Sequence, residues 1–321
     1  PQFGSLSVDF SDTTLAIAGT SFSIELHGSK ASIYHTAVPS GQIAQFEKLL
    51  PDTYVVTVKG TNENQIVVSG TASALVKAGE SASVTVELTK VAKIVTDAAS
   101  LKEAIASGGT VYVANDITVT ENLTINQDVT IRALDKDVTL NLASNVLMFE
   151  VGSGGDLTLG GGDFKLTVNG NKKNQSYSLL NITKGGKVHL YGTITNSYSP
   201  NKTGIEIGES SSFYMYNGAT VSNCECINLY CGGAIAVRPG AVMNMYGGTI
   251  TGNRCYCAAA IYVDGGTFNM SGGTITDNTA TSTSSHPADQ PAAVEITSNG
   301  KFTQTGGSIE DNSPMNVLKK S

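Results

Sequence analysis

The chain has 321 residues, 35 of them glycine and none tryptophan, with 15% charged residues and a formal net charge of −7 at pH 7. An acidic chain lacks the basic surface that attracts phosphates, so we expect no nucleic-acid partner. No apolar run approaches the ~20 residues of a membrane-spanning helix, so we expect no transmembrane span.

Residues 1–92 are predicted to form an antiparallel β-sandwich domain. Alternation of apolar and polar residues marks strands with one buried face, and it occurs in GSLSVDF, TSFSIELHG, TYVVTVKG and SASVTVELTKV. Residues 50–54, LPDTY, together with the order of these segments, resemble the Ig-like module at the N-terminus of exported surface lipoproteins from gut bacteria, with Thr53 where glycine is usual. The resemblance implies a spacer without chemistry of its own.

Residues 97–107 are the one segment predicted to be helical. Asp97 is suited to accept backbone N–H bonds as the N-cap, and Leu101 and Ile105 form an apolar i, i+4 pair. Gly108 and Gly109 follow as a stop signal. Because so short a helix is marginal alone, its place just before the repeats predicts that it caps the open end of the next domain.

Residues 93–321 contain an internal repeat. The pattern Asn-Met-x-Gly-Gly-Thr-Ile-Thr at 244–251 recurs 25 residues later at 269–276. Three short alternating runs in each copy leave no room for a helix, which predicts one coil of a parallel solenoid. The first strands of seven coils are placed at 123–125, 149–151, 180–182, 205–207, 235–237, 261–263 and 294–296.

This repeat resembles the right-handed, single-stranded parallel β-helix of the pectin-lyase-like superfamily, over roughly Thr96 to Asn312. The predicted fold class is all-β: a right-handed parallel β-helix of about seven coils, with the N-terminal antiparallel sandwich and the short capping helix. The superfamily includes lyases, hydrolases, adhesins and inert stalks, so the fold does not choose between functions. Its polygalacturonase motifs, Asn-Thr-Asp and Gly-His-Gly among them, do not occur in this chain.

Outward positions of the first strands supply the candidate site residues, because the resemblance implies a substrate lying across coils. Glu206 and Glu295 are three coils, about 14 Å, apart and too distant for a glycosidase pair, whereas Asp264 and Glu295 lie on adjacent coils. Arg238 is expected either to pair with Asp264 on the surface or to join the site. The catalytic candidates are Asp264, Glu295 and Arg238; the ligand-binding candidates are Glu206, Arg238, Tyr262, Asp264, Glu295 and, from a polar loop, His286 and Asp289. A solvated face without function is the alternative.

All five cysteines lie between Cys224 and Cys257, and the two pairs Cys224 with Cys255 and Cys226 with Cys257 are each 31 residues apart, about one coil. In an exported protein this spacing predicts disulfides between neighbouring coils, with Cys231 left over, or else stacked thiols that remain unpaired. The alternative is a thiolate metal site, although zinc sites usually have C-x2–4-C spacing and both close pairs here are C-x-C.

The sequence as a whole favours an exported protein at the cell surface or anchored to the outer membrane, with its leader outside the given chain. The leading hypothesis is a non-catalytic, adhesin-like β-helix that binds a polysaccharide, surface glycan or other surface partner. The alternatives are a polysaccharide lyase or glycoside hydrolase with an atypical site on the first sheet, and a purely structural stalk. No cofactor or metal is predicted; the acidic cluster of Asp277, Glu310 and Asp311 is the alternative, a Ca²⁺ site.

Overall fold

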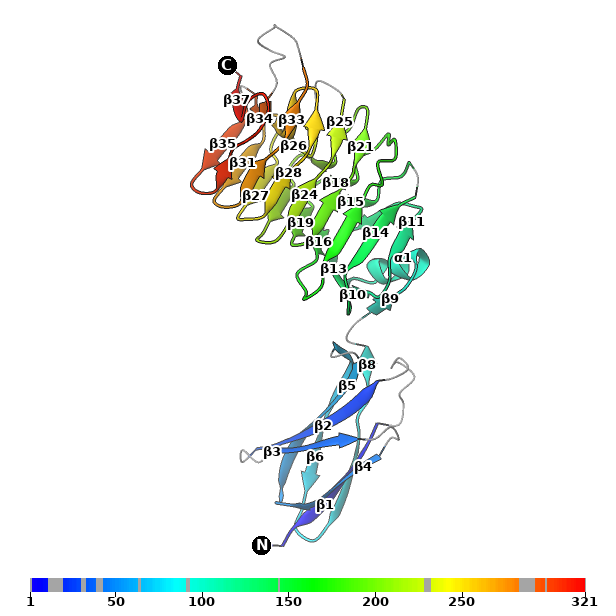
Figure 1. Ribbon diagram of the computed structural model, residues 1–321. Coiled ribbons are helices and arrows are strands. Elements are labelled where there is room, and N and C mark those ends of the chain that lie inside the picture. The colour runs from blue at the N-terminus through cyan, green and yellow to red at the C-terminus, as the bar shows by residue number, and fades with distance from the viewer. Residues whose placement is uncertain are drawn as a thin grey trace. The chain divides into compact units, whose positions relative to one another are not determined.

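The structure is a computed structural model of the chain. It describes residues 2–10, 20–29, 33–38, 43–62, 65–90, 93–143, 145–227, 232–282, 292–297 and 299–320. The chain divides into two units, Pro1–Lys93 and Ile94–Ser321. Figure 1 shows strands alone in the first unit and a stack of short strands with one helix in the second.

The first unit contains two sheets. Their strands are β1 (Gly4–Asp9), β2 (Ser21–Gly28), β3 (Ile33–Val38), β4 (Ile43–Leu49), β5 (Asp52–Asn62), β6 (Gln65–Val76), β7 (Ser81–Thr85) and β8 (Thr89–Lys90). The orders are β4-β1-β7 and β3-β2-β5-β6-β8, with antiparallel pairing except between β1 and β7. Alternate residues are buried in both sheets, and the rings of Phe10 and Phe22 lie 5.3 Å apart. The alternation in the sequence therefore gives the predicted two-sheet core.

The second unit is a parallel β-solenoid of about seven turns. Its first sheet contains β12 (Leu123–Ile125), β15 (Phe149–Val151), β18 (Leu180–Ile182), β22 (Ile205–Ile207), β26 (Ile235–Val237), β30 (Ala258–Val263), β34 (Ala292–Ile296) and β37 (Val317–Lys319). Its second sheet contains β9 (Lys93–Val95), β10 (Gly109–Val113), β13 (Asp128–Ala133), β16 (Asp156–Leu159), β19 (Lys187–Leu190), β23 (Ser212–Met215), β27 (Val242–Met245), β31 (Thr267–Met270) and β35 (Lys301–Gln304).

A third sheet runs through the coils, and a short fourth sheet adds a strand to four of them. The third contains β11 (Ile117–Val119), β14 (Val138–Leu142), β17 (Leu166–Asn169), β20 (Thr193–Thr195), β24 (Thr220–Ser222), β28 (Thr249–Thr251), β32 (Thr274–Thr276) and β36 (Ser308–Ile309). The fourth contains β21 (Tyr198–Ser199), β25 (Glu225–Cys226), β29 (Arg254–Cys255) and β33 (Thr279–Ala280).

The seven predicted first strands all lie in the first sheet and in the predicted register. Leu123 pairs with Phe149, Phe149 with Leu180, and the match continues coil by coil to Val294. The apolar residues on either side of each central position face the interior and are buried. The period of the repeat and the two-residue alternation therefore predict this sheet without help from the structure.

Columns of apolar side chains fill the solenoid. Phe213 pairs in register with Val188 on one side and Met243 on the other, and all three side chains are fully buried. Ile194, Val221, Ile250 and Ile275 form a second buried column. Each side chain therefore packs against an equivalent one from the coil above and the coil below.

The predicted helix is α1 (Ala98–Ala106), capped by Asp97, whose Oδ1 accepts a 2.8 Å hydrogen bond from the backbone N–H of Ser100. This bond lowers the pKa of the Asp97 carboxyl. Leu101 and Ile105 are buried in the solenoid core, and the helix packs against β10, β11 and β12. The helix therefore covers the apolar end of the first coil, as predicted from its position in the sequence.

Asparagines that follow the third-sheet strands form a ladder of side-chain hydrogen bonds. The Nδ2 of Asn253 donates to Oδ1 of Asn278 at 2.9 Å, and the Nδ2 of Asn278 donates to Oδ1 of Asn312 at 2.9 Å. Asn196 and Asn223 also follow third-sheet strands, but they adopt left-handed backbone with φ of 57° and 54°. They stand one position earlier in their coils than the three ladder residues do.

The Gly-Gly pair of the repeat is required by the stacking of turns. The second glycine adopts positive φ in successive coils, 86° at Gly248 and 86° at Gly273. A Cβ on Gly273 would lie 2.6 Å from the carbonyl oxygen of Gly248 in the coil before it. Glycine therefore serves both the left-handed conformation and the close approach between coils.

Candidate functional site

Three of the predicted site residues, Glu206, Asp264 and Tyr262, surround a fourth, Arg238. Its Nε donates to Oε1 of Glu206 at 2.5 Å, and a terminal nitrogen donates to Oδ2 of Asp264 at 3.3 Å. The guanidinium carbon lies 5.7 Å from the centre of the Tyr262 ring. Burial acts to lower the pKa of Arg238, but the hydrogen bond and charge of Glu206, then those of Asp264, raise it on balance. The contact expected between Arg238 and Asp264 is thus present, within a larger ion-pair cluster.

Glu295 is a buried carboxylate beside that cluster, because it pairs in register with Tyr262 on the neighbouring strand. Its side chain is 1% exposed, and Oε1 accepts a hydrogen bond from Nζ of Lys320 at 2.6 Å. Tyr262 is also buried, at 7% exposure. The surface that these two residues were expected to offer a ligand is therefore covered. His286 and Asp289 lie outside the described residues.

The cysteines do not form the predicted pairs. Cys224, Cys255 and Cys257 are buried thiols, whereas Cys226 takes part in a disulfide, and Cys231 lies outside the described residues. The fourth sheet pairs Cys226 with Cys255, a separation of 29 residues instead of 31. Equal spacing in the sequence was misleading because coils differ in length, so register has to be taken from the strands.

Burial governs the chemistry of these thiols. It raises the pKa of Cys224 to about 11 and that of Cys255 to about 12. With a pKa near 11, only ~0.1% of a thiol is the reactive thiolate at pH 8. We therefore expect Cys224 and Cys255 to resist iodoacetamide at pH 8 in the folded protein and to react fully in ~6 M guanidinium. Peptide mass mapping measures each position, and rapid alkylation of native Cys224 would contradict the buried position.

Within the described part of the chain, no group of three or more His, Cys, Asp or Glu side chains is placed to hold a metal ion. Asp277 and Asp311, two members of the acidic cluster, have left-handed backbone at the coil corners, with φ of 56° and 53°. Their placement follows from the turns that close the third sheet.

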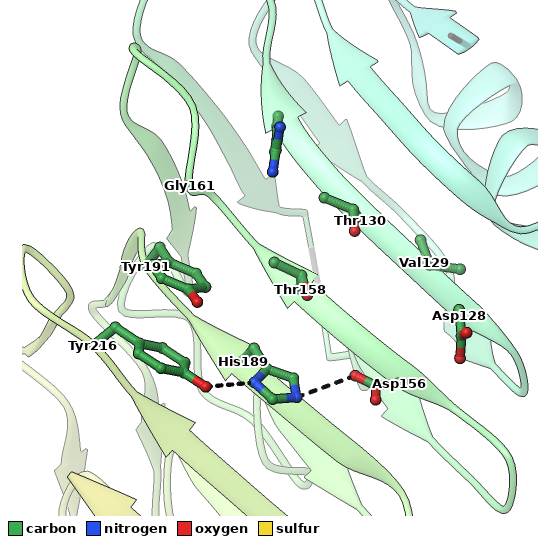
Figure 2. Close-up of a pocket in the computed structure, with 10 residues that line it drawn as sticks. Asp128, Val129, Thr130, Asp156, Thr158, Gly161, His189, Tyr191 and Tyr216 are labelled. Carbon is green, nitrogen blue, oxygen red and sulfur yellow. Dashed lines mark hydrogen bonds and ion pairs between the residues drawn. The ribbon is translucent and has the colours of Figure 1, made fainter. Parts of the chain in front are cut away.

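A groove of about 670 Å³ lies on the outer face of the second sheet (Figure 2). We call it the tyrosine groove. Its lining comes from four successive coils, at and just beyond β13, β16, β19 and β23. The lining residues are Asp128, Val129, Thr130, Arg132, Asp156, Thr158, Gly161, His189, Tyr191 and Tyr216.

Strand alternation directs these side chains outward. In β19, Val188 and Leu190 are buried in the core, so His189 between them faces outward, as does Tyr191 just after the strand. The parallel register then aligns outward residues across coils: Thr158 pairs with His189, and His189 with Tyr214. The groove floor is therefore a consequence of ordinary strand geometry.

Aromatic rings stack along the groove. The rings of Tyr191 and Tyr216 lie 4.3 Å apart and are tilted by 3°, and those of His189 and Tyr214 lie 4.6 Å apart and are tilted by 7°. Tyr246 continues the row, 5.5 Å from Tyr216. Tyr191 and Tyr246 remain 38% and 49% exposed. Stacking thus holds a row of flat, solvent-facing rings in fixed positions.

A hydrogen bond and an ion-pair contact of His189 hold the centre of the groove. Nδ1 of His189 lies 2.9 Å from the Tyr216 hydroxyl, and Nε2 lies 3.4 Å from Oδ1 of Asp156 (Figure 2). An imidazole with its proton on Nε2 satisfies both contacts, because Nδ1 then accepts from the tyrosine hydroxyl. Burial, followed by the neighbouring Tyr191, raises the pKa of Tyr216 to about 12. Tyr216 is therefore a neutral hydrogen-bond donor at ordinary pH.

A stretch of glycines, without side chains, separates Arg132 from the tyrosines. Register carries the position of Arg132 through Gly160 to Tyr191, so glycine stands where the next outward side chain would be. Gly160 and Gly161 have positive φ, and a Cβ on Gly161 would lie 3.5 Å from the Tyr191 ring. The groove is therefore open between a guanidinium and an aromatic ring.

The tyrosine groove was not predicted from the sequence, although the sequence contains a signal for it. Tyr191, Tyr216 and Tyr246 are separated by 25 and 30 residues, the same intervals that separate the first strands beginning at Leu180, Ile205 and Ile235. A side chain that recurs at the coil interval lies at one position on successive coils. Applying this test to the second strand of each coil would have predicted the stack.

The chain matches no protein-family model, no curated protein and no solved structure. Among the described residues, the single helix α1 has nine residues, and no helix is long and apolar enough to cross a membrane.

Proposed function

We propose that this protein is an exported, surface-located β-solenoid that binds glycan without cleaving it, and that the tyrosine groove is its binding site. The observation that carries the proposal is a row of three tyrosines: Tyr191 stacks on Tyr216, Tyr246 lies tilted beside Tyr216, and Tyr191 and Tyr246 remain exposed. The disulfide at Cys226 supports an oxidising compartment. The proposal also includes kinship of the two units with the Ig-like and pectin-lyase-like families.

The chemistry of a sugar matches this surface. A pyranose ring has an apolar face of C–H groups and an edge of hydroxyls. The tyrosine rings supply flat apolar area at low cost in conformational entropy. Asp128, Asp156 and the threonines at 130 and 158 supply acceptors and hydroxyls beside the rings. A site with apolar walls and a few fixed polar groups is typical of small-ligand recognition.

The spacing of the rings suits a chain molecule. Successive coils place equivalent residues ~4.8 Å apart along the solenoid, close to the advance of one sugar unit in an extended glycan. A glycan lying along the solenoid axis would therefore meet one aromatic ring per coil. The site is thus suited to several linked sugars more than to a free monosaccharide.

Tyr191→Ala is expected to weaken glycan binding by ~10-fold, because an aromatic contact is worth ~0.5–1.5 kcal/mol beyond the area it buries. Calorimetry against plant, host and microbial polysaccharides bound by the unmodified protein measures the loss. The matched control is Tyr177→Ala, which removes a tyrosine of 50% exposure that is absent from the groove lining. Equal loss in both variants, or none in either, would count against the groove, and no binding across the panel would favour a structural stalk.

Catalysis is the second candidate, favoured by the chain from Asp156 through His189 to Tyr216. A base oriented by a carboxylate and bonded to a hydroxyl is an arrangement that acid–base enzymes use. However, a tyrosine with a pKa near 12 is ionised in only ~10⁻⁵ of molecules at pH 7, so Tyr216 is a poor base. Shortening of a polysaccharide that is lost in Tyr216→Phe would establish a lyase or hydrolase and replace the binding proposal.

A further inference from the structure

The Arg132 guanidinium has no carboxylate partner among the described residues, in contrast to that of Arg238. Its Nε is shielded from solvent, and among the residues that the structure describes no group accepts a hydrogen bond from it. No described carboxylate forms an ion pair with its guanidinium either, whereas Arg238 contacts both Glu206 and Asp264. A shielded donor without a partner is costly, and in native proteins it usually marks the place of a missing water, ion or ligand group.

The Arg132 side chain that carries this donor belongs to the lining of the tyrosine groove. The bare glycine stretch lies between it and Tyr191. Two coil steps separate the positions of Arg132 and Tyr191, which is ~10 Å along the solenoid. The space is thus sufficient for one sugar substituent to reach the guanidinium while a neighbouring sugar stacks on Tyr191.

Charge within the groove is divided between its two sides. Asp128 and Asp156 pair in register at the start of their strands, whereas Arg132 stands four residues further along β13, ~13 Å from Asp128. Hydroxyls of a ligand would meet the two carboxylates, and an anionic group would be repelled from them towards Arg132. This separation orients an acidic ligand in one way across the groove.

We propose that Arg132 forms an oxyanion subsite of the tyrosine groove, so that the protein selects acidic glycans over neutral ones. The guanidinium suits a carboxylate or a sulfate ester, because both present two oxygens to its fork of N–H donors. This inference rests on the proposed glycan binding and adds the substrate class. It assigns stacking to the tyrosines and recognition of charge to Arg132.

The test uses the full chain and polysaccharides in matched charged and uncharged pairs. The pairs are polygalacturonate and its carboxyl-reduced form, hyaluronan and its carboxyl-reduced form, and κ-carrageenan and its desulfated form. We expect the unmodified protein to bind the charged member of at least one pair ~10–100-fold more tightly, the range for a charge-assisted pair of hydrogen bonds. Preference in the first two pairs identifies a carboxylate, and preference in the third identifies a sulfate.

Variants at Arg132 and Arg254 distinguish recognition of the ligand's charge by one side chain from an effect of the protein's overall charge. Arg132→Gln is expected to bring the charged member down to the affinity of its uncharged partner, and Arg132→Lys to retain part of the preference, since lysine keeps the charge but not the fork. Arg254→Gln makes the same charge change on the short fourth sheet, where the side chain is 61% exposed, and is expected to keep the full preference. Circular dichroism confirms that each variant is folded.

The outcomes distinguish the two proposals. Equal binding of both members in every pair, or an unchanged preference in Arg132→Gln, would overturn the oxyanion subsite and leave glycan binding in place. Tyr191→Ala is expected to weaken charged and uncharged members alike, in contrast to Arg132→Gln. Binding of none of the six polysaccharides would overturn the subsite together with the proposed function.

Discussion

Replacing Phe213 with alanine is expected to destabilise the solenoid by ~3–5 kcal/mol, the usual cost of removing a buried aromatic side chain. Phe213 is fully buried and stands in register between Val188 and Met243. The coils on both sides are bonded to it through the sheet, so they cannot close the cavity by moving together. The loss therefore includes a cavity term as well as the transfer of the ring to water.

The thiols provide a measurement specific to the solenoid, because all five cysteines lie between residues 224 and 257. Alkylation of Cys224 as a function of urea follows opening of the solenoid without a contribution from the first unit. The control is Phe164→Ala, since Phe164 is 38% exposed and its loss is expected to cost ~0.5 kcal/mol or less. If the urea midpoint of Phe213→Ala equals that of this control, the column of side chains that contains Phe213 does not pack as described.

Asn278→Asp is expected to cost ~3–5 kcal/mol at pH 7, the usual cost of a buried charge without compensation. Asn278 is fully buried; its Nδ2 donates to the carbonyl of Ile250 at 3.0 Å and to Asn312, while its Oδ1 accepts from Asn253. The substitution preserves the shape of the side chain and its acceptor oxygen, but it removes both N–H donors of the amide. An ionised carboxylate then faces carbonyl oxygens that it repels.

The pH dependence identifies the cause of this loss. Burial raises the pKa of the introduced carboxyl above its unfolded value of ~3.9, so the folded variant is favoured below that value and loses stability as pH rises through the folded pKa. Urea unfolding should therefore show a smaller difference from the unmodified protein at pH 4 than at pH 7. Asn316→Ala is the control, because Asn316 is the exposed end of the ladder. A difference that is independent of pH would exclude the buried charge as the cause.

The fold was predictable because its signal is periodic. A coil interval combined with two-residue alternation determines which residues pair and which face the core, as the match from Leu123 to Val294 shows. The helix was predictable from Asp97 and the apolar pair Leu101 and Ile105. Each of these features depends on neighbours in the chain or one coil away, so local patterns are sufficient.

The candidate site was less predictable because alternation says which face of a sheet a residue occupies but not what covers that face. Glu295 and Tyr262 occupy outward positions and are nevertheless buried. The cysteine pairs failed because coil length varies, so that Cys226 stands beside Cys255. The tyrosine groove was not predicted because no candidate residue came from the second sheet, where the stacked rings lie.

The column that contains Tyr191, Tyr216 and Tyr246 ends abruptly. In the next coil the pairing of Met245 with Met270 puts Ser271 where a fourth ring would stand. The two coils share the pattern Asn-Met-x-Gly-Gly-Thr-Ile-Thr and differ at its variable position, which is tyrosine in one and serine in the other. Because that position faces away from the core, its identity is independent of the packing that holds the coils together. The number of rings in this column can therefore change one coil at a time without altering the packed core, so the outer surface of the solenoid is free to evolve separately from its stability.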